Sequence, residues 1–201
     1  LWGLAAASGG NIPDTFITEA LKKNTGDAFT EAMLLQALTM IYMRNEQLNE
    51  ALATIELCCE SIKAKSLQQE YCLAAWPLYV SVLRKSIENI EDGNKRQKLL
   101  KRAAQISSIS MKYSKSYKNN LPHALREEGY LQGLRGNLKK ARRLFQRSLK
   151  VANQQLAAYE AALSDLALSE IELHLRIPEA ESYHNRAKEV VNRFNSSLVM
   201  T

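Results

Sequence analysis

Residues 129–152, which read GYLQGLRGNLKKARRLFQRSLKVA, constrain the fold of this chain more than any other stretch. Gly136 and Asn137 form a turn signal, and the residues after it recur at steps of three and four, which is the spacing of a buried helical stripe. That stripe consists of Leu138, Ala141, Leu144, Phe145, Ser148, Leu149 and Ala152. The stretch therefore predicts two helices joined by a short turn. Such a hairpin cannot bury both of its faces alone, so other helices must cover it.

Further helices are predicted on both sides of this hairpin, because periodic segments alternate with clusters of Gly, Pro and Asn and none has the pattern of a strand. After a short helix that ends near Lys23, helix pairs are expected at about 28–64, 68–117, 122–153 and 157–194. We therefore expect an all-α fold, a right-handed superhelical solenoid of antiparallel helix pairs that forms a single helical-repeat domain over residues 1–201. Because the chain begins with Leu1 instead of Met, we expect it to be part of a larger protein.

Local signals predict where several helices begin. Asp14 is a candidate N-cap, since an aspartate side chain can accept a hydrogen bond from a free amide of the first turn, and Asp27 is expected to start a helix of about 28–43. Ser66 to Gln69 has the pattern of a capping box and is predicted to open the next helix. Pro77 lies inside that helix and predicts a kink or a break, because proline lacks an amide donor and disfavours helical geometry at the preceding residue.

The side chains of the central hairpin resemble those of the tetratricopeptide repeat (TPR). Gly129 matches the small residue in the middle of the first helix, and Leu125 stands where a Trp or Leu is usual. On the second helix, Ala141, Phe145 and Ser148 match the sequence of a small residue, an aromatic residue and a small residue. The first and last pairs match the pattern more loosely.

The spacing of the repeats is longer than that of a standard TPR. Ala141 and Ala180 occupy similar positions in their helices and lie 39 residues apart, against about 34 in the TPR. The array is thus similar to the long-period repeats of large regulatory nucleotide-binding or adenylyl cyclase-type proteins. This resemblance implies a protein–protein interaction or regulatory scaffold segment of a larger signalling protein, in which the first helices line a concave groove that holds the partner.

The resemblance also assigns residues to that groove. They are Met33, Gln36, Met40 and Met43 in the first pair, and Arg126 and Tyr130 in the third. Methionine is flexible and polarizable, which suits an adaptable apolar surface, although these methionines would equally suit a core. Family members that hold a terminal carboxylate use Lys or Arg together with Asn at such positions. Gln36 and Tyr130 depart from that pattern, so we do not expect this mode of binding.

The charge of the chain is concentrated in its middle. The formal net charge is +6, but residues 93–159 contain 16 Lys and Arg against only two acidic residues. Residues 1–92 contain 7 basic and 12 acidic residues, and residues 160–201 contain 4 and 7. The basic side chains fall on two predicted helices. One group is Lys95, Arg96, Lys98, Lys101 and Arg102, and the other is Lys139, Lys140, Arg142, Arg143, Arg147 and Lys150.

We expect these two groups to form one positive face, which is either solvated or in contact with an acidic partner. A protein or peptide is the favoured partner, together with other domains of the same larger chain. Nucleic acid is less favoured, because aromatic residues for base stacking are not interleaved with the basic ones. The alternative functions are therefore a nucleic-acid-binding basic α-solenoid, and a structural spacer without a ligand of its own.

Signatures of catalysis are missing from the sequence, which contains no phosphate-binding loop, no nucleophile motif and no metal-ligand spacing. We therefore expect no enzyme, no cofactor and no metal. Cys58, Cys59 and Cys72 are odd in number and are expected to be buried, reduced thiols of a cytoplasmic protein. No apolar run reaches the roughly 18 residues of a transmembrane helix, so no transmembrane segment is expected.

Overall fold

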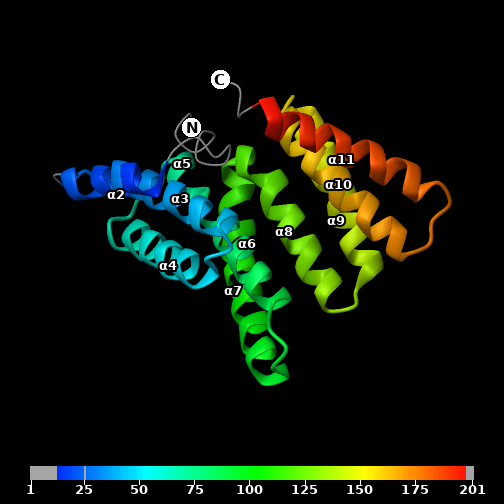
Figure 1. The fold of residues 1–201 in the computed structure, drawn as a ribbon, viewed down its shortest axis with the longest axis horizontal. Coiled ribbons are helices and arrows are strands. Elements are labelled where there is room, and N and C mark those ends of the chain that lie inside the picture. The colour runs from blue at the N-terminus through cyan, green and yellow to red at the C-terminus, as the bar shows by residue number, and fades with distance from the viewer. Residues whose placement is uncertain (1–12, 25, 198–201) are drawn as a thin grey trace. The chain divides into compact units, whose positions relative to one another are not determined.

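The computed structural model describes residues 13–24 and 26–197, which form helices and no strand (Figure 1). The all-α prediction is therefore confirmed. In chain order, the helices of this described part are α2 (Asp14–Lys23), α3 (Ala28–Arg44), α4 (Leu48–Ala64), α5 (Glu70–Leu73), α6 (Ala75–Glu88), α7 (Gly93–Ser116), the 3-10 helix η1 (Lys118–Asn120), α8 (Leu121–Leu134), α9 (Leu138–Gln154), α10 (Ala158–His174) and α11 (Ala180–Ser197).

The helices fall into two compact units, and the boundary between them lies inside α7, between Arg102 and Ala103. The first unit contains α2 to α6 and the beginning of α7. The second contains the remainder of α7, the 3-10 helix and α8 to α11. That residues 1–201 form a single helical-repeat domain stays a prediction.

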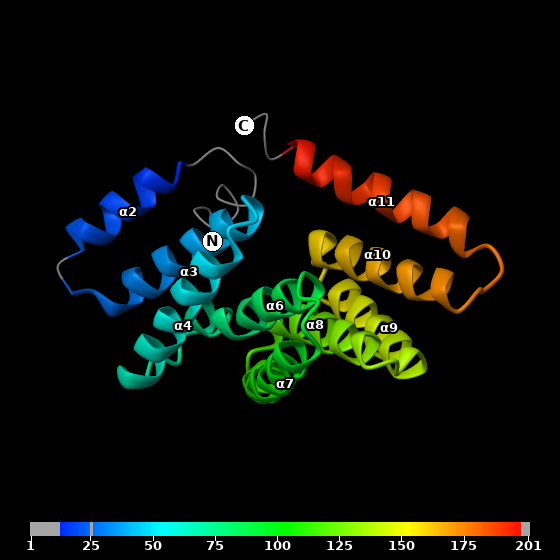
Figure 2. The same ribbon diagram turned by 60° about the horizontal axis from the view of Figure 1, so that its bottom comes forward.

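In the first unit α3 lies between α2 and α4 (Figure 2), α4 also contacts α6, and the short α5 contacts α3 and α6. The contact between α2 and α3 is made by a buried cluster that includes Ile17, Leu38 and Ile41. Trp76 at the start of α6 is fully buried, and the Lys63 ammonium lies 5.0 Å from the centre of its ring. Burial of apolar side chains is thus what holds these helices together.

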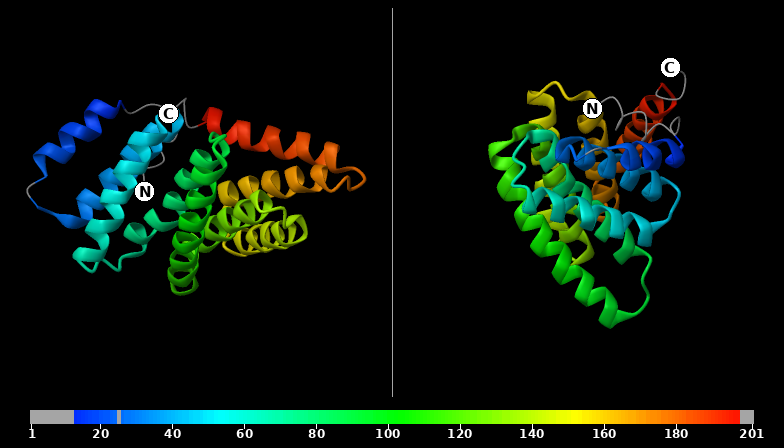
Figure 3. Two further views of the ribbon diagram at one scale, coloured as in Figure 1. Left: turned by 90° about the horizontal axis from the view of Figure 1, so that it is seen from below. Right: turned by 90° about the vertical axis from the view of Figure 1, so that its left-hand side faces the viewer.

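In the second unit α8, α9, α10 and α11 pack in chain order, and α10 and α11 run antiparallel (Figure 3). Its core contains Ala141 and Phe145 from α9 together with Ala167 and Ile171 from α10. The outward side of α9 is exposed and the opposite side is buried, as the stripe in the sequence predicts.

Successive helices of the second unit are joined by one repeated turn. Gly136, Leu156 and Arg176 have positive φ angles of 79°, 55° and 53°, and they follow one another at intervals of 20 residues. After each of them, a backbone N–H bonds to the carbonyl five residues earlier, as from Asn137 to Gln132 at 2.9 Å. This is the hydrogen bond of a Schellman helix end. Because α9 and α10 each contain 17 residues and the turns are short, a helix pair here repeats after 40 residues.

The predicted helix start at Asp27 is confirmed, and the predicted N-cap at Asp14 is wrong. The Asp27 carboxylate accepts hydrogen bonds from the backbone amides of Phe29 at 3.1 Å and Thr30 at 3.2 Å. Asp14, in contrast, is the first residue of α2, and Pro13 occupies the N-cap position. Proline can take this position because its missing amide is not required at a helix start.

The predicted capping box is also wrong. Ser66 has a φ angle of 50° and lies in the turn that ends α4, and α5 begins only at Glu70. The Schellman turn needs a left-handed residue at this point, and that requirement decides the conformation of Ser66. The break predicted at Pro77 is confirmed, since the helix is interrupted at Ala74 and Pro77 lies in the first turn of α6. There the missing amide costs no helical hydrogen bond.

Candidate interaction surfaces

The hairpin of α8 and α9 is fixed by a close fit between a glycine and an aromatic ring. A Cβ atom placed on Gly129 would lie 2.5 Å from Cε1 and 2.8 Å from Cδ1 of Phe145. The ring is buried, with 2% of its residue surface exposed, and the Tyr130 ring packs against it edge-on at a centroid distance of 5.0 Å. Only glycine leaves room for this contact, so the two helices must meet at this register.

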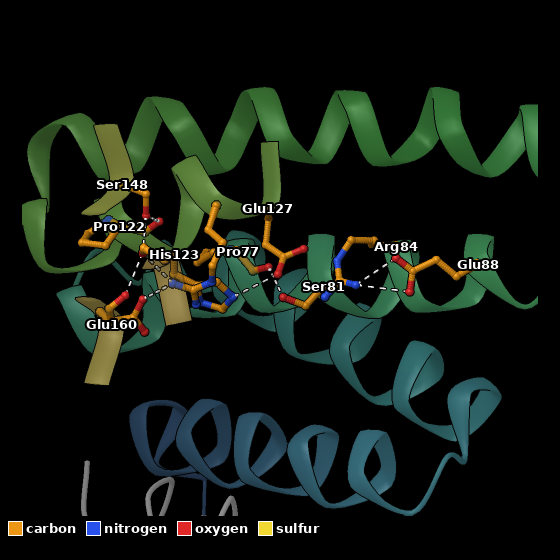
Figure 4. A network of polar contacts seen from close by, with 11 residues as sticks. Pro77, Ser81, Arg84, Glu88, Pro122, His123, Glu127, Ser148 and Glu160 are labelled. Atoms are coloured by element: carbon orange, nitrogen blue, oxygen red, sulfur yellow. Dashed lines mark hydrogen bonds and ion pairs between the residues drawn. The ribbon is translucent and has the colours of Figure 1, made fainter. Parts of the chain in front are cut away.

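A small polar cluster continues the contact from α8 through α9 to α10. The Ser148 hydroxyl donates a hydrogen bond to the Pro122 carbonyl at 2.6 Å and lies 2.7 Å from the Ser164 hydroxyl (Figure 4). The same view shows His123, whose Nε2 atom is 3.8 Å from the Glu127 carboxylate. Both serines are fully buried, and their small size lets the three helices approach closely.

Arg126 and Glu160 form an ion pair beside this cluster, with 2.6 Å between Nη1 and Oε2. Burial by itself raises the pKa of the Glu160 carboxyl, but the Arg126 guanidinium, together with His123, holds the pKa below its ordinary value. Burial likewise lowers the pKa of Arg126, but Glu160, with smaller contributions from Glu127 and Tyr130, raises it above its ordinary value. The pair therefore links α8 to α10 in the charged form.

The outward side of α9 carries a line of exposed cations, which we name the α9 strip. Its members are Lys139, Lys140, Arg143, Arg147 and Lys150. Within the part of the chain that the structure describes, no carboxylate forms an ion pair with them. Arg142 of the same helix differs, because it faces α10 and pairs with Glu172 at 2.8 Å. The strip is thus a positive surface whose charge is not neutralised by ion pairs with carboxylates of the described residues.

A shallow hollow lies next to the α9 strip, where α9 meets α10. Its volume is about 570 Å³, and Lys150 belongs both to its lining and to the strip. The other lining residues are Gln146, Leu149, Asn153, Gln154 and Leu168. The sequence did not predict this hollow, because Leu168 belongs to a different helix and no local pattern indicates that it lies beside α9.

Comparisons with known proteins show a similarity of fold to a solved structure. No family model matches the sequence, and neither does any curated protein. Among solved structures, the crystal structure of a thermophilic TPR protein from Thermus thermophilus is similar over 93% of this chain and 89% of that one, with a TM-score of 0.66 and 17% sequence identity.

The fold is TPR-like. At 17% identity the likeness shows the fold alone, so the contact surfaces of this chain must be argued from its own residues.

Two residues assigned to the groove of the TPR-like fold make internal contacts instead of facing an open surface. Gln36 is 1% exposed, and its side-chain amide donates to the backbone carbonyls of Ala32 at 3.1 Å and Tyr71 at 3.2 Å. Arg126 is 6% exposed and is held by Glu160. Both side chains therefore serve to connect helices within their units.

The remaining groove candidates are half-buried. Met33, Met40 and Met43 lie along one side of α3 in the first unit. Tyr130 of the second unit packs on Phe145, and its hydroxyl donates to Glu170 at 3.4 Å. Part of each side chain remains accessible, so binding through these four residues stays a prediction.

The basic group on α7 is less uniform than the α9 strip. Lys95, Lys98 and Lys101 are exposed and Arg96 is half-buried. Arg102 pairs with Glu56 at 2.5 Å, and its guanidinium lies 5.5 Å from the centre of the Tyr79 ring. Since this group belongs to the first unit and the α9 strip to the second, the single positive face stays a prediction.

Sites for metals or reactive thiols are not found in residues 13–24 and 26–197. No three His, Cys, Asp or Glu side chains of this range are placed to hold a metal ion. Cys58, Cys59 and Cys72 are buried and free, and burial raises the pKa of the Cys58 thiol to about 12. The Cys58 thiol is therefore protonated at neutral pH and is a poor nucleophile. No helix in the described range combines the length and the apolar character that a membrane span requires.

Proposed function

We propose that this chain is a protein-interaction segment, which acts as a scaffold or regulatory part of a larger signalling protein in the cytoplasm. The TPR-like fold supports an interaction role in general. The α9 strip is the observation that supports a specific surface. The half-buried methionines of α3 and the Tyr130 ring are proposed as apolar contacts with a protein partner.

The strip needs a functional explanation because it opposes helix stability. Lys139, Arg143 and Arg147 are spaced four residues apart, so like charges face one another along the helix. Each such pair destabilises a helix by about 0.2–0.5 kcal/mol. An acidic partner surface would remove this repulsion on binding and would also accelerate encounter at low salt.

The test is affinity capture with three forms of the chain. The first is the unchanged chain, the second carries Arg143→Glu and Arg147→Glu, and the third carries Lys22→Glu and Lys23→Glu on the exposed end of α2. The third form has the same net charge as the second and serves as its control. We expect proteins that are captured by the first and third forms and lost from the second. Identical capture by all three would contradict the proposal.

Nucleic-acid binding is the second candidate, and the excess of 16 basic over two acidic residues in 93–159 is the observation that favours it. A salt titration with generic single- and double-stranded RNA and DNA separates the two functions. Micromolar, steeply salt-dependent binding that is lost on reversing Arg142, Arg143 and Arg147 would establish nucleic acid as the ligand. A folded chain that binds neither nucleic acid nor protein would be a structural spacer.

A further inference from the structure

Four members of the α9 strip form a straight row. Lys139, Arg143, Arg147 and Lys150 follow at steps of four, four and three residues, so they lie on one line along the outward side of α9. With a rise of 1.5 Å per residue, the row is about 16 Å long. This length corresponds to three helical turns and suits a helical segment lying along α9.

The hollow adds a partly apolar binding position at one end of this row. Leu149 and Leu168 are half-buried and give it an apolar part, and the amides of Gln146 and Asn153 give it a polar part. Lys150 lines the hollow and ends the row of cations. A partner side chain that enters the hollow is therefore placed beside a cation.

The carboxylates nearest to Leu168 on α10 do not cancel the positive charge. Glu172 pairs with Arg142 at 2.8 Å. Burial raises the pKa of Asp165, and Arg186 of α11 lowers it without reversing that rise. The charge left over on this side of the second unit is that of the α9 strip.

We propose that the α9 strip and the hollow together bind an acidic helical segment of a partner protein, which inserts one apolar side chain between α9 and α10. The carboxylates of that segment face Lys139, Arg143 and Arg147. This inference rests on the proposed function and names the partner class at its surface.

The chemistry of the surface distinguishes such a segment from nucleic acid. Non-specific single-strand binders stack bases on aromatic side chains, and the outward side of α9 carries none. The apolar part of the hollow, formed by Leu149 and Leu168, suits a leucine side chain and offers a phosphate no hydrogen-bond donor. Apolar burial adds affinity that does not depend on salt, while the row of cations adds a part that does.

The probe is a fluorescein-labelled helical peptide of Ala and Glu, with Glu at every fourth position and one Leu a turn beyond the last Glu. Three further probes are the same peptide with Leu→Ser, the same peptide with Glu→Gln, and single-stranded RNA of equal charge. Fluorescence anisotropy is measured against salt concentration. We expect the Leu→Ser peptide to bind about tenfold more weakly and the Glu→Gln peptide to show no binding.

Variants of the chain show which residues provide the salt-dependent part of the affinity and which provide the apolar part. Arg143→Glu with Arg147→Glu should abolish binding, and the control Lys22→Glu with Lys23→Glu should leave it unchanged. Asn153→Trp fills the hollow without altering charge. Asn153→Trp should weaken binding of the Leu peptide about tenfold and leave binding of the Leu→Ser peptide nearly unchanged. The reason is that the change in the chain and the change in the peptide remove the same contact. Circular dichroism confirms that each variant is folded.

Three results would overturn the inference. Equal affinity for the Leu and Leu→Ser peptides would show that the hollow is not used, even where protein capture still depends on the strip. Tighter binding of RNA than of the acidic peptide would assign the surface to nucleic acid. Concentration-dependent self-association in sedimentation experiments, lost in the Arg143→Glu and Arg147→Glu variant, would show that the acidic part of a second copy occupies it.

Discussion

The hairpin α3–α4 of the first unit and the hairpin α8–α9 of the second make the same contact at positions 90 residues apart. In the first, the Cys58 Sγ atom lies 3.5 Å from the Ala32 carbonyl. In the second, the Ser148 hydroxyl donates to the Pro122 carbonyl at 2.6 Å. Each hairpin thus keeps a small side chain on its second helix where the first helix crosses closely. The thiol and the hydroxyl fill the same space with hydrogen bonds of different strength.

The two hairpins differ in how they fill the crossing itself. Gly129 and Phe145 in the second unit are matched by Thr39 and Ile55 in the first, and both Thr39 and Ile55 are fully buried. A larger residue on one helix therefore accompanies a smaller one on the other. From this difference we infer that the summed volume of the two side chains matters at these positions. Neither a glycine on the first helix nor an aromatic residue on the second is required by itself.

The link to the following helix also differs between the hairpins. Gln36 donates to the backbone carbonyl of Tyr71, whereas Arg126, at the equivalent position, pairs with the Glu160 carboxylate. The first link is neutral and the second is charged. A TPR-like hairpin can therefore be joined to its neighbour by either kind of contact.

The largest effect is expected for Phe145→Ala. The ring is 2% exposed and fills the space above Gly129, so its removal should lower the free energy of unfolding by about 3–5 kcal/mol. Urea denaturation followed by circular dichroism measures this loss. A change near zero would mean that the register of the hairpin is wrong.

Glu160→Ala should cost nearly as much, because it removes the carboxylate that pairs with the buried Arg126. Breaking a buried ion pair in this way costs about 3–5 kcal/mol. The double variant Arg126→Gln with Glu160→Gln, which imitates the neutral link of Gln36, should recover most of that loss. If the double variant were as unstable as Glu160→Ala, the neutral and charged links would not be equivalent.

The charged link also predicts a dependence on pH. Since the pKa of Glu160 is lower in the folded chain than its ordinary value of 4.5, its contribution to stability is present above pH 4.5 and is lost as the pH falls through the lowered pKa. Urea midpoints at neutral pH and at about pH 3 should therefore differ more for the unchanged chain than for Arg126→Gln with Glu160→Gln. An equal difference in the two proteins would show that Glu160 does not titrate with this shift.

Replacing Gly129 and Phe145 by the residues at the equivalent positions of the first hairpin tests whether their summed volume matters. Gly129→Thr alone should destabilise the chain by about 1–3 kcal/mol, because any Cβ at 129 collides with the Phe145 ring. Adding Phe145→Ile reproduces the pair of the first hairpin and should cost less than the sum of the two single changes. Additive losses in a double-mutant cycle would mean that the two positions are not coupled.

The smallest effect is expected at the turns. Leu156 is 91% exposed and has a φ angle of 55°, a conformation that Gly136 adopts without strain in the preceding turn. Leu156→Gly should raise the free energy of unfolding by about 0.5 kcal/mol, because relief of strain outweighs the greater freedom of glycine in the unfolded chain. Arg176→Gly makes the same change in the next turn, and thermal unfolding measures the stability of both variants. A loss of stability in both would show that the left-handed residue is not strained.

Local patterns predicted much of the fold and little of the candidate site. The stripe around Phe145, the turn at Gly136 and the Asp27 cap depend on side chains close in sequence, and all three are found in the structure. The predicted cap at Asp14 failed because Asp14 is already the first residue of α2, and the box at Ser66 failed because the turn that ends α4 decides the conformation of Ser66. Burial of Gln36 and Arg126 was not visible from their polarity, since both side chains find acceptors on a later helix.

By itself the sequence determined that this chain is all-α, where its central hairpin turns, and which side of α9 is basic, because helical periodicity and charge are properties of consecutive residues. Only the tertiary structure decided which basic side chains remain without a partner and where an apolar hollow opens beside them. Arg142 is neutralised by a residue 30 positions away, and the hollow depends on Leu168 meeting α9. Such contacts follow from how helices pack, which no local pattern records.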